Sequence, residues 1–270
     1  MLNFLLPLLA LWANAAPPAD DPASVRARAD ALVSVSFVLK DGDDETQSEC
    51  YGLLVDHSGI VVCPNSRLGG KSQAISQMMA AMQQDISIEV RDIKVVIGND
   101  GDEVPAELIS RDGELDLAWL KLSTPPPADA AVADLKDLTT PKLGQRLFAL
   151  ARAGRFLGRP ALLVSTQLGG FVKTPRRLLL CTLRFNEPGV PVFDAQGHFV
   201  GMTVLQIPEV DLAGGPDIAM MNLSQQLQTA GMMVLPGDTI AQATTQALQA
   251  AATRPSSSPA SEPAAKTPTK

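Results

Sequence analysis

The sequence predicts an all-β protein, either a barrel or a sandwich, with a few short helices. Apolar runs of strand length recur between Ser24 and Pro236, and Gly, Asp and Asn interrupt them. About ten such runs fit into this stretch, at the short spacing that is typical of barrels and sandwiches. A proline-rich segment, residues 123–128, divides the runs into two comparable halves.

The strands can be followed in order along the chain. Residues 32–39 alternate between apolar and small polar side chains, and a turn at residues 40–43 follows. Residues 52–55 and 59–62 flank Asp56-His57-Ser58, which predicts a hairpin with Gly59 at its exit. The remaining predicted strands are 93–97, 106–109, 117–122, 146–150, 161–164, 178–182, 190–193 and 199–204.

Three helical segments interrupt this pattern. Residues 72–84 place Ile75 and three methionines at helical spacing, and residues 222–230 end at Gly231, a good C-terminal stop. The methionine face either packs on the barrel or binds a partner. Asp238-Thr239 is a candidate cap for a short Ala- and Gln-rich helix that ends near Ala252.

Both ends of the chain predict segments outside the folded domain. Residues 1–15 are apolar up to Trp12, apart from Asn3, and end in small residues, as a signal peptide does, and the alternative is a buried N-terminal helix. Residues 16–27 are expected to be a disordered N-terminus, and residues 236–270 a helix-prone and then disordered tail. We therefore expect an exported protein, periplasmic or secreted.

Composition excludes several classes of function. The net charge is -7 and the pI is about 4.9, which argues against a nucleic-acid partner. Two His and three Cys are too few for a multi-zinc protein, so we expect no metal and no cofactor. No apolar run beyond the signal segment is as long as a membrane span, so we expect no integral span after signal cleavage.

Three separated segments, in order, resemble the trypsin-like peptidases, especially the HtrA (Deg) type. Gly52-Leu-Leu-Val-Asp-His-Ser-Gly-Ile-Val-Val-Cys-Pro-Asn-Ser66 is similar to the strand and turn that end on the catalytic His. Asp116-Leu-Ala-Trp-Leu-Lys121 is similar to the run that begins at the catalytic Asp. Asn186-Glu-Pro-Gly-Val-Pro191, with Gly197 and Gly201 after it, resembles the nucleophile loop.

The resemblance implies two packed, antiparallel, six-stranded β-barrels with the active-site cleft between them. The whole domain would span residues 28–235, with an N-terminal barrel at about 28–122 and a C-terminal barrel at about 136–232. Residues 218–223 resemble the strand that precedes the closing helix of the family. HtrA enzymes carry a PDZ domain after the protease domain, and we expect none here.

Matching the motifs residue by residue gives a degenerate catalytic triad. The His position falls on Ser66, the Asp position on Asp116 and the nucleophile position on Pro188. Serine is no base near neutral pH, and proline has neither a side-chain nucleophile nor the N–H that normally stabilises an oxyanion. The degenerate oxyanion loop is Asn186, Glu187, Pro188 and Gly189, and the resemblance therefore implies no catalytic residue.

Other side chains are not expected to restore the site. His57 and His198 lie in turns and are expected to face solvent, as is Glu187. We expect Asp116 to be a structural carboxylate that accepts hydrogen bonds from nearby backbone or from Ser66. The alternative is an active trypsin-like serine endopeptidase with a rearranged site, for which one of the two histidines would have to meet a nucleophile.

The cysteines allow a disulfide. Cys50 and Cys63 lie on the two arms of the predicted hairpin, and export makes a bridge between them plausible, with two reduced and buried thiols as the alternative. Cys181 lies in an apolar run and is expected to be a single buried thiol.

The predicted function is therefore binding without catalysis. We expect an exported trypsin-like pseudoprotease that binds an unknown peptide or protein at the cleft between the barrels, where a strand can extend a sheet edge. A further alternative is a scaffold subunit of an envelope assembly that uses the tail as a tether.

Overall fold

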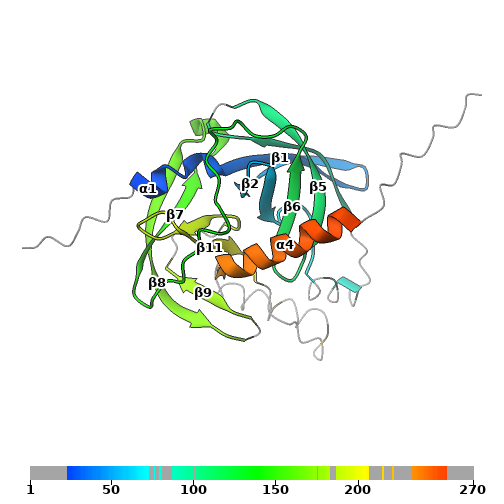
Figure 1. The fold of residues 1–270 in the computed structure, drawn as a ribbon. Helices are drawn as coiled ribbons and strands as arrows, with labels where there is room; N and C mark the ends of the chain where they lie inside the picture. Colours follow the sequence, from blue (N-terminus) through cyan, green and yellow to red (C-terminus); the bar gives the residue numbers. More distant parts are fainter. Residues whose placement is uncertain are drawn as a thin grey trace, which may run out of the picture.

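The computed structural model describes residues 23–72, 76, 79–80, 87–99, 101–174, 176–182, 187–206, 215, 221 and 233–253. Several predicted features therefore lie outside the described residues: the signal peptide at 1–15, the helix at 222–230, residue Asn186 and most of the helix at 72–84. Within the described residues, the strands form two closed barrels (Figure 1).

The N-terminal barrel forms from the first six strands. Its strands follow the order β1-β2-β3-β6-β5-β4, and all neighbours are antiparallel. Alternating apolar side chains, such as Val33, Val35 and Phe37 on β1, fill its interior. The strands are β1 (Leu32–Asp41), β2 (Asp44–Leu54), β3 (Ile60–Pro64), β4 (Ile88–Val96), β5 (Glu103–Asp112) and β6 (Leu117–Leu122).

The C-terminal barrel has the order β10-β11-β12-β9-β8-β7, again antiparallel throughout. Its interior contains Leu147, Ala149 and Leu168 among other buried apolar residues. The predicted fold class, two six-stranded antiparallel barrels, is confirmed. The strands are β7 (Arg146–Arg152), β8 (Ala161–Val172), β9 (Leu178–Cys181), β10 (Pro191–Phe193), β11 (Phe199–Val204) and β12 (Met233–Pro236).

The last strand lies later in the chain than expected. β12 (Met233–Pro236) lies beyond the end expected for the C-terminal barrel at about residue 232, and it pairs with β11 and β9 to complete the barrel. The helix α4 (Gly237–Thr253) follows directly, so β12 and α4 hold the place assigned to residues 218–223 and the helix after them. Apart from Met221, residues 218–223 lie outside the described residues.

The start of the described chain is ordered, unlike the disorder expected for all of residues 16–27. Helix α1 (Ala23–Arg26) is followed by the short helix η1 (Ala29–Ala31), and Val25 is fully buried. Gly197 allows this contact, because a Cβ at that position would meet the Ser24 carbonyl oxygen at 3.0 Å. The apolar Val25 and Ala31 therefore cover a turn of the C-terminal barrel before the chain enters β1.

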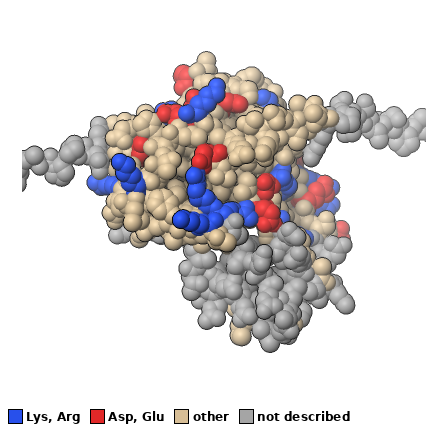
Figure 2. Space-filling model, turned by 60° about the horizontal axis from the view of Figure 1, so that its bottom comes forward, with Lys and Arg blue, Asp and Glu red and all other residues tan. Residues whose placement is uncertain are grey.

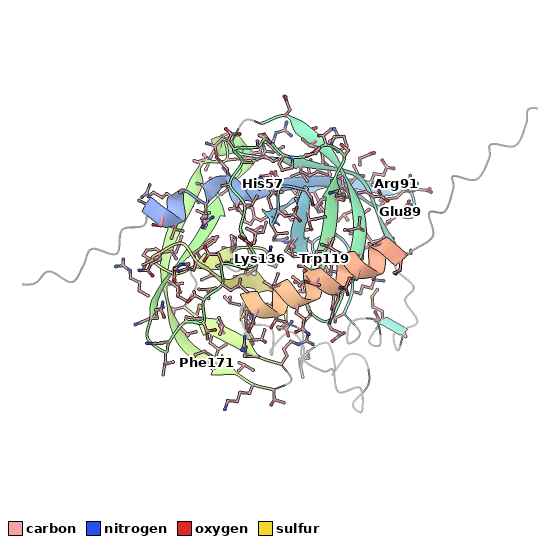
Figure 3. The ribbon with its side chains drawn as sticks, in the orientation of Figure 1. His57, Glu89, Arg91, Trp119, Lys136 and Phe171 are labelled. Atoms are coloured by element: carbon pink, nitrogen blue, oxygen red, sulfur yellow. The ribbon has the colours of Figure 1, made fainter. Side chains whose placement is uncertain are left out.

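Helix α4 contacts both barrels. It packs against β5 of the first barrel and against β11 and β12 of the second (Figure 1). Ile240, Ala243 and Ala247 are buried, and the indole N–H of Trp119, which lies behind α4 in Figure 3, donates to Thr244 Oγ1 at 2.9 Å. The predicted helix was therefore correct in extent, but it is part of the core and no tail. No helix in the described part of the chain has the length and apolarity to cross a membrane.

A buried arginine also joins the two barrels. Arg152 ends β7, and its Nε donates to the carbonyl oxygen of Leu32 at 2.8 Å while its Nη2 donates to that of Ala29 at 2.7 Å. The hydroxyl of Tyr51, on β2, donates in turn to the Arg152 carbonyl oxygen. Charge-assisted hydrogen bonds of this kind fix the position of the first barrel against the second and so set the walls of the cleft.

Candidate functional site

Ser66 and Asp116 meet at the cleft end of the N-terminal barrel. Ser66 follows β3 and Asp116 precedes β6, and these strands pair from Ile60 to Pro64. The backbone N–H of Ser66 donates to Asp116 Oδ1 at 2.6 Å, and its hydroxyl donates to Oδ2 at 3.1 Å. The side chain at the expected base position is thus a hydrogen-bond donor to the carboxylate.

Asp116 also binds the second barrel. The N–H of Leu205, directly after β11, donates to Asp116 Oδ2 at 2.8 Å. Asp116 is 3% exposed and has a φ of 56°, a conformation that Asp and Asn tolerate better than most residues. Burial raises the pKa of this carboxyl, and the three hydrogen bonds oppose that rise. Asp116 therefore connects the two barrels, which is the structural role expected from the sequence.

The loop at the nucleophile position is bound to β11 through Thr203. The buried Thr203 hydroxyl donates to the Glu187 carbonyl oxygen at 2.8 Å and accepts the N–H of Val190 at 2.8 Å. The N–H of Gly189 donates to the Thr203 carbonyl oxygen, also at 2.8 Å. Since Pro188 has no N–H, the segment from Pro188 to Val190 directs no N–H toward a ligand.

Gly189 is required at its position. Its φ is 93°, in the left-handed region that favours glycine. A Cβ there would also lie 2.8 Å from the Pro64 ring and 3.2 Å from the Tyr51 carbonyl oxygen. The loop therefore packs tightly against the N-terminal barrel, with Pro188 itself buried.

Glu187 is partly exposed, and it also has a partner that the sequence did not identify, an ion pair with Arg67. Its Oε1 lies 3.2 Å from Arg67 Nη2, and both side chains are partly exposed. Arg67 directly follows Ser66, so the pair links the loops that hold the His and nucleophile positions. An exposed pair of this kind contributes little to stability, but it adds charge at the mouth of the site.

Among the described residues, no contact joins His57 or His198 to Ser66, Asp116 or the loop at Pro188. His57 is exposed in the turn between β2 and β3, and β3 separates it from Ser66. His198 lies in the turn between β10 and β11, where Nδ1 is 2.9 Å from Asp194 Oδ2 and Nε2 is 3.6 Å from Asp137 Oδ1. It is therefore partly exposed, as predicted for a turn residue, but the two carboxylates hold it in place.

Because of its contacts with Asp194 and Asp137, His198 makes the stability of the folded protein depend on pH. The hydrogen bond to Asp194 raises the pKa of His198, so the protonated imidazole stabilises the fold below the unfolded value of about 6.5. That contribution is lost as the pH rises through the folded value. We expect the melting temperature of the wild type to exceed that of His198→Gln by more at pH 5.5 than at pH 8.5. The matched control is His57→Gln, and a larger pH effect in that variant would contradict this assignment.

The structure describes Cys50 and Cys63 as free thiols, not as the predicted disulfide. Both are buried in the N-terminal barrel. Leu53 pairs with Val62, and Cys50 lies three residues before Leu53 whereas Cys63 lies one residue after Val62, so the two cysteines are not equally far from that pair. A hydrogen bond with Cys63 and burial raise the pKa of Cys50 well above its usual value, and burial raises that of Cys181 to about 11.

Burial shields Cys50 and Cys63 from reagents, and the raised pKa values of Cys50 and of the partly exposed Cys181 keep them as thiols, whereas the thiolate is the reactive form. We expect maleimide to modify none of the three cysteines rapidly in the native protein, and all of them after unfolding without reductant. Mass spectrometry counts the added groups. If fewer than three groups are added to the unfolded and unreduced protein, a disulfide is present and this assignment is wrong.

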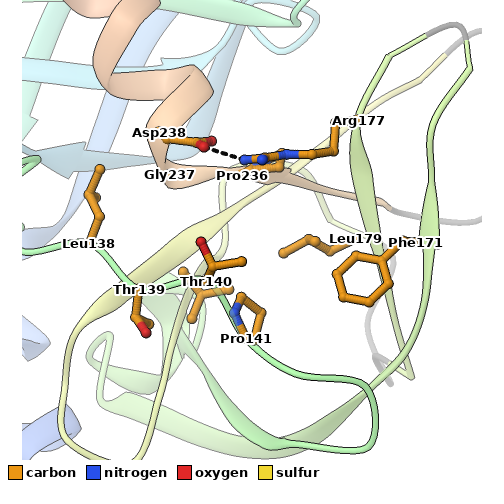
Figure 4. A pocket seen from close by; sticks show the side chains of 11 residues that line it. Leu138, Thr139, Thr140, Pro141, Phe171, Arg177, Leu179, Pro236, Gly237 and Asp238 are labelled. Atoms are coloured by element: carbon orange, nitrogen blue, oxygen red, sulfur yellow. Dashed lines mark hydrogen bonds and ion pairs between the residues drawn. The ribbon is translucent and has the colours of Figure 1, made fainter.

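Two hollows are candidates for ligand binding. The first, of about 210 Å³, lies between the barrels and is lined by Asn65, Ser66, Gly70, Lys71, Ser72, Gly113, Asp116 and Leu205. The second, of about 160 Å³, opens at the corner where β12 becomes α4 (Figure 4). There Phe171 and Leu179 form an apolar wall, and Arg177 reaches over the corner to pair with Asp238. Only the first hollow includes the residues that the motifs selected.

The surface charges are mixed. On the face drawn in Figure 2, basic and acidic side chains form mixed groups, and uncharged surface lies between the groups. Ion pairs such as Arg176–Glu114 and Lys94–Glu103 are formed by described residues.

A comparison with known protein families identifies the fold. The model of the trypsin-like peptidase domain matches residues 50–202, more than half of the chain. The matched stretch begins on β2 and ends on β11, and it includes Ser66, Asp116 and the loop at Pro188. The chain belongs to the trypsin-like peptidase family.

Sequence reasoning missed two residues that shape this site. Thr203 lies inside the apolar run of β11, so its hydroxyl gave no sign that it holds the nucleophile loop. Arg67 follows Ser66 directly, and its charge beside a motif residue was the signal that could have identified a partner for Glu187.

Proposed function

We propose that this chain is a trypsin-like pseudoprotease of HtrA type that binds peptides or proteins and does not cleave them. The observation that carries the proposal is the state of the nucleophile loop. Pro188 stands where the family has its nucleophile, and the neighbouring N–H groups of Gly189 and Val190 donate to Thr203. Acyl transfer needs a nucleophile, a base and oxyanion donors, and these residues supply none of them.

The hydrogen bond between Ser66 and Asp116 supports the same proposal. A base at the Ser66 position would have to accept a proton from the nucleophile, whereas the Ser66 hydroxyl donates a hydrogen bond to Asp116. His198 is bound to Asp194 and Asp137 in a turn of the second barrel. The alternative of a rearranged endopeptidase site would have to detach this imidazole from both carboxylates.

The binding surface in this proposal is the cleft between the barrels. The hollow of about 210 Å³ beside Ser66 has room for one or two side chains of a peptide, and the partly exposed Arg67–Glu187 pair, next in the chain to Ser66 and Pro188, supplies both signs of charge. We further propose that residues 1–15 are a signal peptide and that the protein acts after export. N-terminal sequencing of the exported protein should then begin at residue 16.

The binding proposal is tested by selecting peptides on the wild-type protein and measuring their affinity for two variants. Arg67→Trp places a bulky ring at the mouth of the cleft, and Glu89→Trp places one on the exposed β4, outside it (Figure 3). We expect peptide affinity to fall by about tenfold or more in Arg67→Trp and to stay within about twofold in Glu89→Trp. Equal affinity for both variants, or cleavage of the selected peptides by the wild type, would count against the proposal.

A further inference from the structure

Two large apolar side chains project into solvent at the tip of the β7–β8 connection. Phe156 is 98% exposed and Leu157 is 65% exposed, and both belong to the short helix η2 (Arg155–Leu157). Gly154 and Gly158 flank this helix, and a Cβ at either position would meet no atom within 4 Å. The tip, residues 154–158, is therefore convex and stands away from the barrel. Adjacent apolar side chains that are this exposed are typical of an interaction site.

The backbone of the tip forms hydrogen bonds within the tip itself. The N–H of Leu157 donates to the Gly154 carbonyl oxygen at 2.9 Å. The N–H of Gly158 donates to the Arg155 carbonyl oxygen at 3.0 Å. Backbone groups that already have partners lose less free energy when they leave water. The tip is therefore better suited to an apolar medium than a loop whose backbone depends on water.

The base of the tip is fixed to the folded barrels. The N–H of Ala153 donates to the Pro160 carbonyl oxygen at 3.0 Å and closes the loop. Nη1 of the buried Arg152 donates to the Arg159 carbonyl oxygen at 3.1 Å. Nε of Arg159 donates in turn to Glu49 Oε1, on β2, at 2.8 Å. Because the base is already ordered, binding at the tip costs little conformational entropy.

A positive charge lies beside the two apolar side chains. Arg155 is exposed, and no ion pair joins it to a described residue. The carboxylate of Glu103 attracts Arg155 only weakly, because it pairs with Lys94 at 2.8 Å. A guanidinium binds phosphate well, and an arginine beside exposed apolar side chains favours a surface of anionic lipids.

We propose that this tip inserts into the surface of a membrane that contains anionic lipids. Phe156 and Leu157 enter the boundary between headgroups and acyl chains, and Arg155 binds lipid phosphates. A protein partner would need a pocket shaped for the projecting ring, whereas a lipid surface needs no matching shape, so the convex tip favours lipid. The site is separate from the cleft and does not depend on the function proposed for the cleft.

The binding of the full chain to vesicles is measured by cosedimentation, with phosphatidylcholine alone and with added phosphatidylglycerol. We expect Phe156→Ser to bind the mixed vesicles at least about fivefold more weakly than the wild type. Leu143→Ser is the matched control and should stay within about twofold. Leu143 is 66% exposed, but it lies before β7, at the end of that strand opposite the tip. All variants share the same N-terminal segment, so differences between them report on the tip.

Two further variants test the charge and the separation from the cleft. Arg155→Glu should weaken binding to the mixed vesicles more than binding to phosphatidylcholine alone, because only the mixed surface is anionic. Arg67→Trp, which changes the cleft, should bind both kinds of vesicle as the wild type does. Thermal unfolding shows whether each variant is folded.

Insertion is distinguished from adsorption by the fluorescence of Phe156→Trp and Leu143→Trp, after the wild-type emission is subtracted. On vesicles, the emission added by Phe156→Trp should move to shorter wavelength and be quenched by brominated acyl chains. The emission added by Leu143→Trp should show neither effect. Wild-type binding by Phe156→Ser, an unchanged emission of Phe156→Trp, equal quenching in both reporters, or loss of binding in Arg67→Trp would overturn the proposal.

Discussion

Replacing Asp116 with alanine is expected to lower the free energy of unfolding by about 2–4 kcal/mol at pH 7. The change removes the acceptor for the N–H groups of Ser66 and Leu205, and each buried donor left without a partner costs about 1–3 kcal/mol. Water that enters the adjacent hollow offsets part of this cost. Because the two donors belong to different barrels, the loss reports a contact between barrels. Urea unfolding followed by circular dichroism measures it.

Asp112→Ala is the matched control for this prediction. Asp112 Oδ1 also accepts two backbone N–H groups, those of Glu114 and Leu115, each at 2.9 Å, but both lie in the same surface turn. Water replaces the carboxylate there, so we expect a loss below about 1 kcal/mol. Equal losses in the two variants would show that Asp116 has no special role between the barrels.

Substitutions on the buried face of α4 are expected to have a second large effect. Ile240 is fully buried where the helix crosses both barrels, and Ile240→Ala should cost about 2–5 kcal/mol through lost burial and the cavity that remains. Thr244→Val keeps the volume but leaves the indole N–H of Trp119 without its acceptor, which should cost about 1–3 kcal/mol. Chemical unfolding monitored by circular dichroism measures both losses.

The neighbouring threonine supplies the control for the helix. Thr245 is exposed, and its hydroxyl donates only to the Ala241 carbonyl oxygen one turn earlier, at 3.0 Å. Thr245→Val should therefore change the free energy of unfolding by no more than about 0.5 kcal/mol. If Thr244→Val were as mild, the helix would not be anchored through Trp119.

The barrel strands could be predicted from the sequence because their signal is local. Alternation in β1 and the continuous apolar run of β11 each mark a strand that buries one face or both. β12 was missed because its four residues adjoin a helix and give no alternation. Its strand character comes from pairing with β11 and β9, which no short window of sequence contains.

Only those residues of the candidate site that belong to the family motifs could be predicted from the sequence. Ser66 and Asp116 were found through their neighbours in the motifs, and their contact follows from the pairing of β3 with β6. The roles of Thr203 and Arg67, and the placement of Cys50 relative to Cys63, depend on register and on packing between barrels. The register between two strands depends on tertiary packing. With one register Cys50 and Cys63 would lie opposite each other and could form a disulfide, whereas with another they remain two separate thiols.

A serine-hydrolase probe tests most directly the claim that this trypsin-like domain has no activated nucleophile. A fluorophosphonate reacts covalently with a hydroxyl that a neighbouring base activates, and mass spectrometry detects the added group. We expect no labelling of the folded protein at a concentration that fully labels active trypsin. Stoichiometric labelling that disappears on mutation of a single serine would contradict the claim and show that a nucleophile and a base still meet in this fold.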